Sequence, residues 1–206
     1  MSEFDRHWPV TVQGPRLLLR PLRRRDKAEW MHLRRSNDRW LAPWDATLPE
    51  GTGYPADFGQ MVATQNRSAR QGQCLPWVIA LPSIHTRRAP IVGQLSVSSI
   101  VWGAARSGSI GYWVDAKHAG AGIAPEAVAM AVDHCFTAMG LHRIEINIRP
   151  ENGASLRVVE KLGFRDEGVR KDYLHINGQW ADHRSFALTA AEVPEGMLNQ
   201  WLARTP

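Results

Sequence analysis

The sequence predicts an α/β fold of the mixed α+β kind, in which a mostly antiparallel sheet carries helices on both faces. Strand patterns follow one another between residues 75 and 114, with short connections rich in Pro and Gly that are typical of hairpins. A helical pattern then precedes a strand centred on Ile146, and this order favours a parallel pair joined by a right-handed crossover. Asn177-Gly178 predicts a further tight hairpin.

The first half of the chain is expected to hold a strand and two helices before the sheet continues. The strand covers residues 16–20, and Asp26 is expected to cap a helix that carries Trp30. Residues 37–55 form a long irregular segment rich in Trp and Pro, and loops of this kind often line functional sites. A second helix is expected to begin after Asp57.

The second half is expected to hold most of the sheet. Its predicted strands cover residues 75–81, 91–100, 107–114, 144–148, 172–176 and 180–188. A helix with its apolar stripe from Val128 to Met139 is expected over residues 125–139, ending at Gly140. A shorter helix is expected over residues 154–162, closed by Gly163.

Length and composition are those of a globular chain, which we expect to form a single domain over residues 1–206. With 206 residues and 44% hydrophobic residues, the chain can bury a substantial core. It has no apolar stretch of membrane-spanning length and no signal-peptide pattern, so we expect a cytoplasmic protein without a membrane partner. Cys74 and Cys135 lack metal-ligand spacing, so we expect buried thiols, no disulfide and no metal.

The positive charge is concentrated in the first half of the chain. Residues 1–100 contain 14 Lys and Arg against 8 Asp and Glu, whereas the remainder contains 11 against 12. Six arginines surround the first predicted helix: Arg23, Arg24, Arg25, Arg34, Arg35 and Arg39. They fit contact with a nucleic-acid-rich assembly or an acidic cofactor, and a solvated basic face fits equally well. No nucleic-acid-binding motif accompanies them.

The segment from Gly111 to Val128 reads as a strand, a turn with two glycines and a helix. Gly120 and Gly122 allow successive N–H groups to point at one anion beside a helix N-terminus, which suits a pyrophosphate. An ordinary strand-to-helix loop is the alternative. The P-loop and dinucleotide templates do not fit, since Pro125 stands where a third glycine is needed. We expect Pro125 to be the first helical residue, so that the candidate N–H donors end at Ala124.

A second motif follows the strand centred on Ile146. Its informative residues are Asn152, Ser155, Lys161, Gly163 and Phe164. Together with Lys117-x-x-Gly120-x-Gly122, in this order and spacing, they resemble the two signatures of the GNAT acetyltransferases, with Lys at the leading position in place of Gln or Arg. The resemblance covers nearly the whole chain and implies a splayed GNAT sheet and acetyl-CoA as cosubstrate.

Three other segments resemble the RimJ/RimL branch of that family and in particular its RimJ type. They are residues 16–20, Trp40-Leu41-x-Pro43-Trp44, and residues 171–183. The resemblance implies acetylation of an N-terminal amine, expected to be alanine, on a ribosomal protein by direct attack within a ternary complex. The basic N-terminal half is then a candidate ribosome contact. The sequence gives no indication of the oligomeric state.

The resemblance also implies a set of cosubstrate-binding residues: Trp113, Val114, Lys117, Gly120, Ala121, Gly122, Ile123, Ala124, Asn152 and Ser155. The pyrophosphate is expected on the amides of the glycine turn and the pantetheine arm along the strand that ends at Val114. The amide of Val114 is expected to polarise the thioester carbonyl. Asn152 is read as a helix N-cap, as a partner of the pantetheine amide, or as both.

Acid and base assignments are less direct. Ser155 is either an ordinary first-turn residue or the acid that protonates the departing thiolate, because Val159 occupies the position where many relatives carry a tyrosine. Leu174 occupies the position where the resemblance implies a glutamate base, so the base stays unassigned. Each of the remaining candidates is more often a structural residue than a base; they are Asp172, Tyr173, Asp182, His183 and His118. An α-amine of pKa near 8 needs no strong base.

The acceptor is expected to contact Trp40, Trp44 and Tyr173, with core packing as the alternative for the two tryptophans. Arg157 and Lys161 lie where they could reach the phosphates of CoA. Two other functions stay open at this point. One is acetylation of a polyamine or aminoglycoside, and the other is a non-catalytic acyl-CoA-binding or ribosome-associated module.

Overall fold

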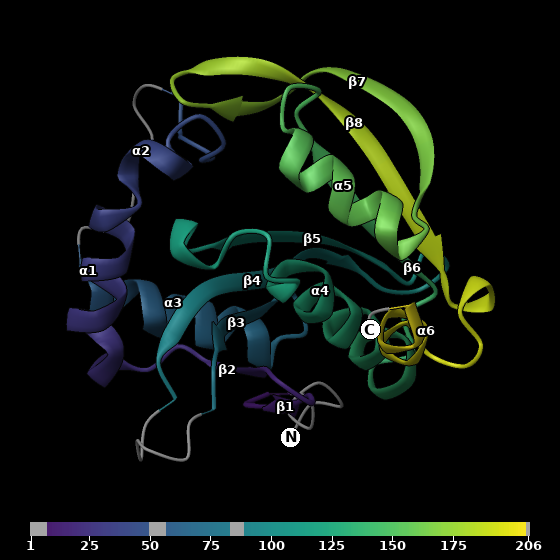
Figure 1. Ribbon diagram of the computed structural model, residues 1–206, viewed down its shortest axis with the longest axis horizontal. Helices are drawn as coiled ribbons and strands as arrows, with labels where there is room; N and C mark the ends of the chain where they lie inside the picture. Colours follow the sequence, from purple (N-terminus) through teal and green to yellow (C-terminus); the bar gives the residue numbers. More distant parts are fainter. Residues whose placement is uncertain (1–7, 50–56, 83–88, 205–206) are drawn as a thin grey trace.

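The computed structural model describes residues 8–49, 57–82 and 89–204, and these residues form an eight-stranded mixed sheet (Figure 1). The strand order is β1-β2-β3-β4-β5-β6-β8-β7. Its strands are β1 (Val12–Gln13), β2 (Leu18–Pro21), β3 (Leu75–Ala80), β4 (Ile91–Val101), β5 (Ser107–Val114), β6 (Arg143–Ile148), β7 (Arg165–Ile176) and β8 (Gln179–Thr189). Neighbours are antiparallel except β5 and β6, which confirms the predicted hairpins and the parallel crossover.

The parallel pair holds together over a short stretch. Register pairs join Ser107–Ser109 of β5 to Arg143–Glu145 of β6, and the two strands then separate toward their C-terminal ends. From there β7 and β8 arch away from β5, with α5 lying against them (Figure 1). The sheet is therefore splayed, as the family resemblance implies.

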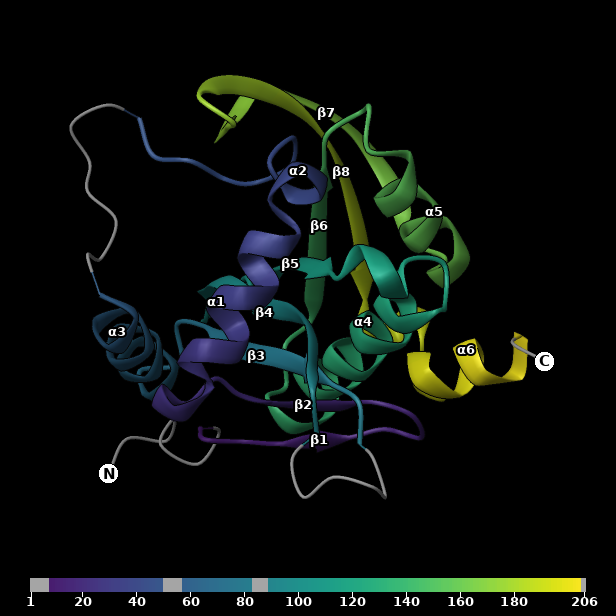
Figure 2. The ribbon, with the colours of Figure 1, turned by 60° about the vertical axis from the view of Figure 1, so that its left-hand side comes forward.

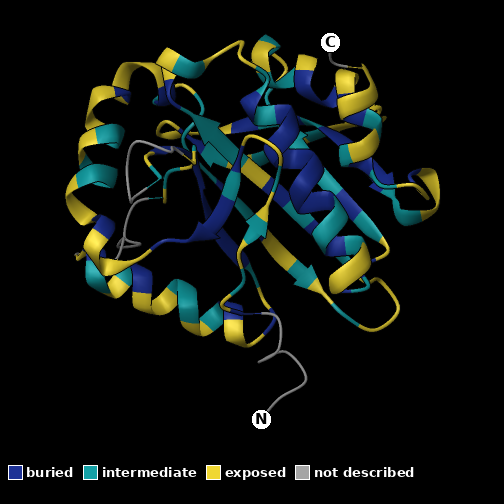
Figure 3. Cartoon of the chain, turned by 60° about the horizontal axis from the view of Figure 1, so that its bottom comes forward, coloured by how far each residue is buried: buried dark blue, intermediate teal, exposed yellow. Residues whose placement is uncertain are grey.

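Helices cover both faces of the sheet (Figure 2). They are α1 (Lys27–Ser36), α2 (Asp38–Leu41), α3 (Phe58–Arg70), α4 (Ile123–Asp133), α5 (Gly153–Leu162) and α6 (Met197–Arg204). On one face α4 is buried along almost its whole length and packs against α5 and α6 (Figure 3). On the other face Trp30 of α1 and Phe58 and Val62 of α3 share a smaller core with Leu22, Val78 and Ile91.

Several element boundaries differ from the prediction. Helix α4 begins at Ile123 rather than Pro125, with Gly122 as its N-cap, because the positive φ of 76° at Gly122 already turns the chain into the helix. A wide helical turn, η4 (His134–Ala138), continues it to Gly140. The short strand β1 and the helix α6 were not predicted, and the irregular segment contains α2; its residues 50–55 lie outside the described residues.

Asp26 is also placed differently. Its carboxylate makes no capping bond to α1; it accepts the Arg23 N–H at 2.8 Å and pairs with the Arg20 guanidinium at 2.7 Å, both charges being buried. By contrast, the Asp57 carboxylate does cap α3 by accepting the N–H groups of Gly59 and Gln60. Both cysteines are free thiols, and burial raises the pKa of each.

Candidate active site

The turn before α4, residues 119–122 and called the glycine turn below, leaves the N–H groups of Gly120 and Gly122 without a protein acceptor among the described residues, whereas the N–H groups of Ala119 and Ala121 donate to the carbonyls of Ala116 and His118. Gly120 and Gly122 both have positive φ, and no side chain caps α4. The N–H groups of Ile123 and Ala124 belong to the first helical turn and have no protein acceptor among the described residues. The glycine turn and the helix start therefore have the free N–H groups that an anion site at this position requires.

An ion pair from the N-terminal strand region supports this turn. The Arg16 guanidinium contacts the fully buried Glu126 carboxylate at 2.6 Å and donates to the Ala121 carbonyl at 3.3 Å. Arg16 is half exposed and lies beside Gly122, so the Arg16–Glu126 pair joins the segment before β2 to the glycine turn. The sequence placed Arg16 in a strand and gave no sign of this contact, because the partner is 110 residues away.

The end of β5 faces the gap between the separated strands. The Asp115 N–H donates to the Val92 carbonyl at 2.8 Å, so the alternation of an antiparallel pair turns the Val114 N–H and carbonyl away from β4. The Val114 carbonyl there accepts the Trp40 indole N–H at 3.2 Å. Its N–H is directed into the same gap, as the predicted carbonyl-polarising role requires.

Helix α5 forms the opposite side of the gap. The Asn152 side-chain oxygen accepts the Ser155 N–H at 3.1 Å, which confirms that Asn152 is the N-cap of α5. This bond uses only the oxygen of the amide, so its NH2 group stays available to a ligand. The second interpretation of Asn152, as a pantetheine partner, is compatible with this geometry.

A buried tyrosine from β5 lies beside Ser155. The Tyr112 hydroxyl is buried and forms no hydrogen bond of standard geometry within the described part of the chain. Burial raises its pKa, and interaction with the Ser155 side chain partly offsets the rise, leaving a pKa of about 12. Tyr112 lies inside the strand predicted over residues 107–114, but the sequence alone does not show that its hydroxyl lies next to α5 across the gap.

These groups line one cavity of about 580 Å³. It brings together most of the predicted residues: Trp40, Trp44, Trp113, Val114, Gly120, Gly122, Ile123, Ala124, Asn152, Ser155, Arg157 and Lys161. Lys117 and Ala121 lie next to the lining without forming it. Two carboxylates that the sequence analysis did not select, Asp45 and Glu151, also line the cavity.

Of the candidate bases, only His118 lines the cavity. It lies 3.4 Å from the Asp115 carboxylate. Tyr173 and His183 stack edge to face on the β7–β8 hairpin, where the Arg170 guanidinium also covers the Tyr173 ring. Asp182 pairs with Lys171 and accepts the Asp172 N–H on the same hairpin.

One wall of the cavity is the tryptophan loop, residues 37–49, which contacts the β7–β8 hairpin. Ala46 forms a β-bridge with Ile176, and Thr47 joins the hairpin through its N–H to the His175 carbonyl at 2.9 Å and its hydroxyl to the Gly178 N–H at 3.0 Å. At its start, the Asn37 side chain accepts the Ala116 N–H at 2.9 Å. The loop therefore connects the end of β5 with the hairpin.

The Arg34 guanidinium of α1 pairs with the Asp45 carboxylate of the loop and lies over the Trp113 ring of β5. Arg149 lies over the Trp44 ring and donates to the Pro43 carbonyl at 3.0 Å. Trp113 of β5 and Trp44 of the loop, which both line the cavity, are thus each covered by an arginine from another element. Trp40 is 43% exposed, which argues against simple core packing for that residue.

Neither a metal centre nor a membrane span emerges from the described residues. They contain no group of three or more His, Cys, Asp or Glu side chains arranged to hold a metal ion. Their helices are also too short or too polar to cross a bilayer.

Comparison with known proteins identifies the family. Residues 16–165 match the acetyltransferase (GNAT) domain family. The solved structure of Mycobacterium smegmatis RimJ in complex with CoA-disulfide is 39% identical, covers 96% of this chain and 95% of that chain, and has a TM-score of 0.87. The ribosomal protein uS5-alanine N-acetyltransferase of Escherichia coli is 30% identical over 91% of this chain and 94% of that protein.

A third relative matches over a shorter region. The probable N-acetyltransferase YjcK of Bacillus subtilis is 43% identical over 98 residues, which are 48% of this chain and 54% of that protein, so the match spans about half of its length. The family match extends across most of the chain and includes both glycine-turn and α5 motifs. The chain therefore belongs to the GNAT acetyltransferase family, in the RimJ/RimL branch that its motifs resemble, and it is an N-acetyltransferase enzyme.

Proposed function

We propose that this enzyme transfers the acetyl group of acetyl-CoA to the N-terminal α-amine, of alanine, on a ribosomal protein. The observation that carries the proposal is the single cavity in which the glycine turn, the gap-facing edge of β5 and the start of α5 meet the tryptophan loop. The first three elements suit a pyrophosphate, a pantetheine arm and a thioester. We assign to the acceptor the remaining part of the cavity, beside the tryptophan loop and the β7–β8 hairpin.

The acceptor assignment draws on the relatives. The Escherichia coli protein named above acts on the alanine of ribosomal protein uS5, and it aligns with 91% of this chain. The aligned region includes the tryptophan loop, and this loop contributes Trp40 and Trp44 to the lining of the cavity. Such an acceptor places the reaction in the cytoplasm.

The reaction proceeds by direct attack. The neutral α-amine adds to the thioester carbonyl, whose oxygen is stabilised by the Val114 N–H, and the C–S bond then breaks to release CoA thiolate. The thiolate takes the Ser155 hydroxyl proton, and the serine regains a proton from the ammonium of the collapsing intermediate through solvent. No covalent enzyme intermediate is needed.

We assign Tyr112 a supporting role in this step: its hydroxyl lies beside Ser155, and in the occupied site it donates a hydrogen bond to the Ser155 oxygen. With a pKa of about 12, Tyr112 keeps its proton at neutral pH and can act as a hydrogen-bond donor beside Ser155. This role accounts for a buried hydroxyl that otherwise lacks a well-formed bond. It also supplies a phenol to the site although Val159 has replaced the usual tyrosine.

The test uses purified enzyme, acetyl-CoA and peptides that begin with Ala, Ser or Met. Thiol release and a mass gain of one acetyl group are expected with the Ala peptide, and the same peptide with a blocked N-terminus but a free lysine should not react. Spermidine and an aminoglycoside test small-amine acceptors. Acetylation of these amines with no reaction at any peptide α-amine would overturn the acceptor assignment.

A second experiment addresses the ribosomal acceptor. Ribosomal proteins purified without this modification are incubated with the enzyme and acetyl-CoA, and intact-mass spectrometry identifies which protein gains an acetyl group. Modification of one protein that begins with alanine is expected. No acetyl gain on any ribosomal protein, under conditions in which the Ala peptide is acetylated, would contradict the ribosomal part of the proposal.

A further inference from the structure

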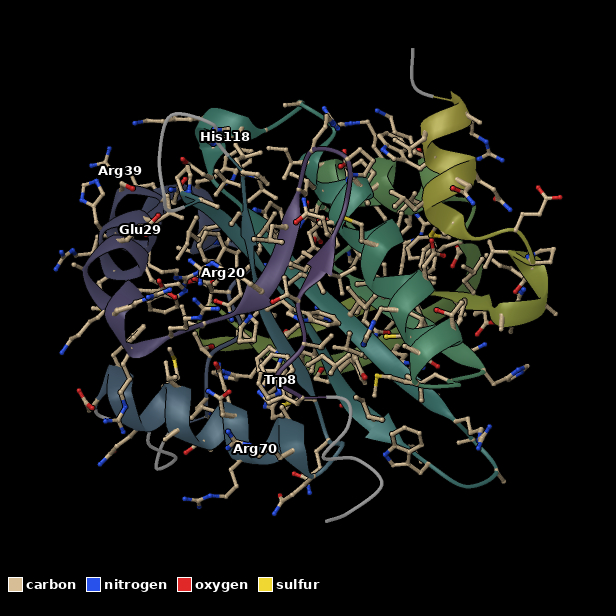
Figure 4. The ribbon with its side chains drawn as sticks, turned by 90° about the horizontal axis from the view of Figure 1, so that it is seen from below. Trp8, Arg20, Glu29, Arg39, Arg70 and His118 are labelled. Carbon is tan, nitrogen blue, oxygen red and sulfur yellow. The ribbon has the colours of Figure 1, made fainter. Side chains whose placement is uncertain are left out.

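A second cavity, of about 910 Å³, lies between the β2–α1 connection and α3 and shares no lining residue with the active site. Four arginines line it: Arg23 and Arg24 from the connection, and Arg67 and Arg70 from α3. All four are exposed, and no carboxylate is among the lining residues. Figure 4 shows this side of the molecule, with Arg70 near the end of α3.

Lack of ion pairing distinguishes these arginines from others in the protein. Arg20, Arg34 and Arg143 each contact a carboxylate, whereas the four arginines of this groove have no ion pair within the described ranges. Arg67 and Arg70 are three residues apart on α3, so they extend from the same face of the helix. Like charges held this close repel one another, and a bound polyanion removes that cost.

The lining also indicates which part of a polyanion is recognised. Guanidinium groups match phosphate oxygens with paired N–H donors. Side chains that stack on bases are aromatic, and none of the residues lining this groove is aromatic. The groove therefore suits a phosphodiester backbone rather than exposed bases, which predicts binding without sequence preference.

We infer that this arginine groove, lined by Arg23, Arg24, Arg67 and Arg70, binds the phosphate backbone of structured RNA. The choice of RNA rests on the proposed ribosomal acceptor, because a ribosomal protein presents its N-terminus beside ribosomal RNA during or after assembly. Binding there would hold the enzyme close to its acceptor while the active site, in a separate cavity, remains free.

The test is fluorescence anisotropy of a labelled RNA hairpin titrated with the full chain at several salt concentrations. With four arginine contacts, log Kd is expected to change with log salt concentration with a slope of roughly 3 to 4. Arg67→Glu with Arg70→Glu should weaken binding by about tenfold or more at low salt and reduce the slope by about 2. Circular dichroism and thermal unfolding check that the variant folds.

The matched control is Arg35→Glu with Arg39→Glu, which changes the net charge by the same amount at two exposed arginines of α1 and α2. It should retain most of the RNA affinity. Equal losses in both variants would assign the effect to net charge and overturn the groove as a site. Polyglutamate of similar length should bind weakly, and tighter binding of polyglutamate than of RNA would also overturn the inference.

Acetylation of a free Ala peptide separates this inference from the proposed function. The Arg67→Glu and Arg70→Glu variant should acetylate that peptide at the normal rate, because its changes lie outside the active-site cavity. If no α-amine is acetylated by the unaltered enzyme, the proposed function fails while the RNA titration still gives its own answer.

Discussion

The indole N–H of Trp40 donates a hydrogen bond of 3.2 Å to the carbonyl of Val114. This bond joins the tryptophan loop to the residue at which β5 ends and the sheet is open. The side of the cavity assigned to the acceptor is thus fixed directly to the residue assigned to the thioester, although the two residues are 74 positions apart.

Trp40→Phe keeps an aromatic wall but removes this donor. Loss of one such bond is worth about 1 kcal/mol, so the KM for the acceptor peptide should rise roughly fivefold while the KM for acetyl-CoA changes less. Trp102→Phe is the control, because the Trp102 indole donates a similar bond of 3.0 Å to the Gly72 carbonyl outside the active-site cavity. Unchanged steady-state constants for Trp40→Phe would show that the bond only supports packing.

Ser155→Ala should lower kcat by roughly a hundredfold if the serine protonates the thiolate, with little change in the KM for acetyl-CoA. Tyr112→Phe should lower kcat by about fivefold, since it removes one hydrogen bond to the serine oxygen. In a double-mutant cycle, Tyr112→Phe should have almost no further effect in the Ser155→Ala enzyme. Full additivity of the two losses would contradict action through Ser155.

Gly122→Ala should destabilise the enzyme and weaken cosubstrate binding. A side chain at φ of +76° costs about 1 to 2 kcal/mol, and the new methyl group would meet the Arg16 guanidinium at 3.2 Å. Gly103→Ala carries the same backbone strain at φ of +70°, but its methyl group meets nothing within 4 Å. Both variants should unfold at lower temperature, and only Gly122→Ala should raise the KM for acetyl-CoA.

His183 makes stability depend on pH. Burial lowers the pKa of this imidazole below its ordinary value of 6.5, so the folded protein binds fewer protons than the unfolded chain as the pH falls past that value. Unfolding free energy should therefore decrease from pH 7 toward pH 5.5. Urea titrations across this window should give a flatter pH dependence for His183→Gln, whereas His32→Gln, at an exposed histidine, should keep the slope of the unaltered protein.

Carboxylates account for a separate loss of stability at lower pH. Hydrogen bonds from Arg143 and Arg165 hold the pKa of Glu167 at about 2, and those from Arg184 and the Gly168 N–H lower the pKa of Asp166. Their contributions are present above the ordinary carboxylate range and disappear only as the pH falls below it. A pH window of 5.5 to 7 therefore isolates the effect of the histidine.

The sequence predicted those features that depend on neighbours in the chain. Gly120, Gly122 and Gly163 take the positive φ values that their turns require, and α3 begins directly after Asp57 as predicted. Asn177-Gly178 forms the predicted hairpin turn. The local backbone conformation determines each of these features, so a short segment of sequence is enough to predict it.

Features that depend on distant partners were not predicted or were predicted wrongly. Asp26 has the position of a cap, but Arg20 provides a buried partner with a stronger interaction. Tyr112, Asp45 and Arg16 enter the site through contacts with other elements, and no pattern within their own segments marks them.

The short pairing of β5 with β6 affects how firmly the two parts of the sheet are held together. Three register pairs join the two parts of the sheet directly, and the tryptophan loop bonded to the hairpin bridges them at the far end of the gap. We expect a cosubstrate bound in that gap to contact both parts of the sheet and to hold them together. Its concentration then sets how firmly the halves hold together, because a ligand bound only to the native state adds RT ln(1 + [L]/Kd) to the free energy of unfolding.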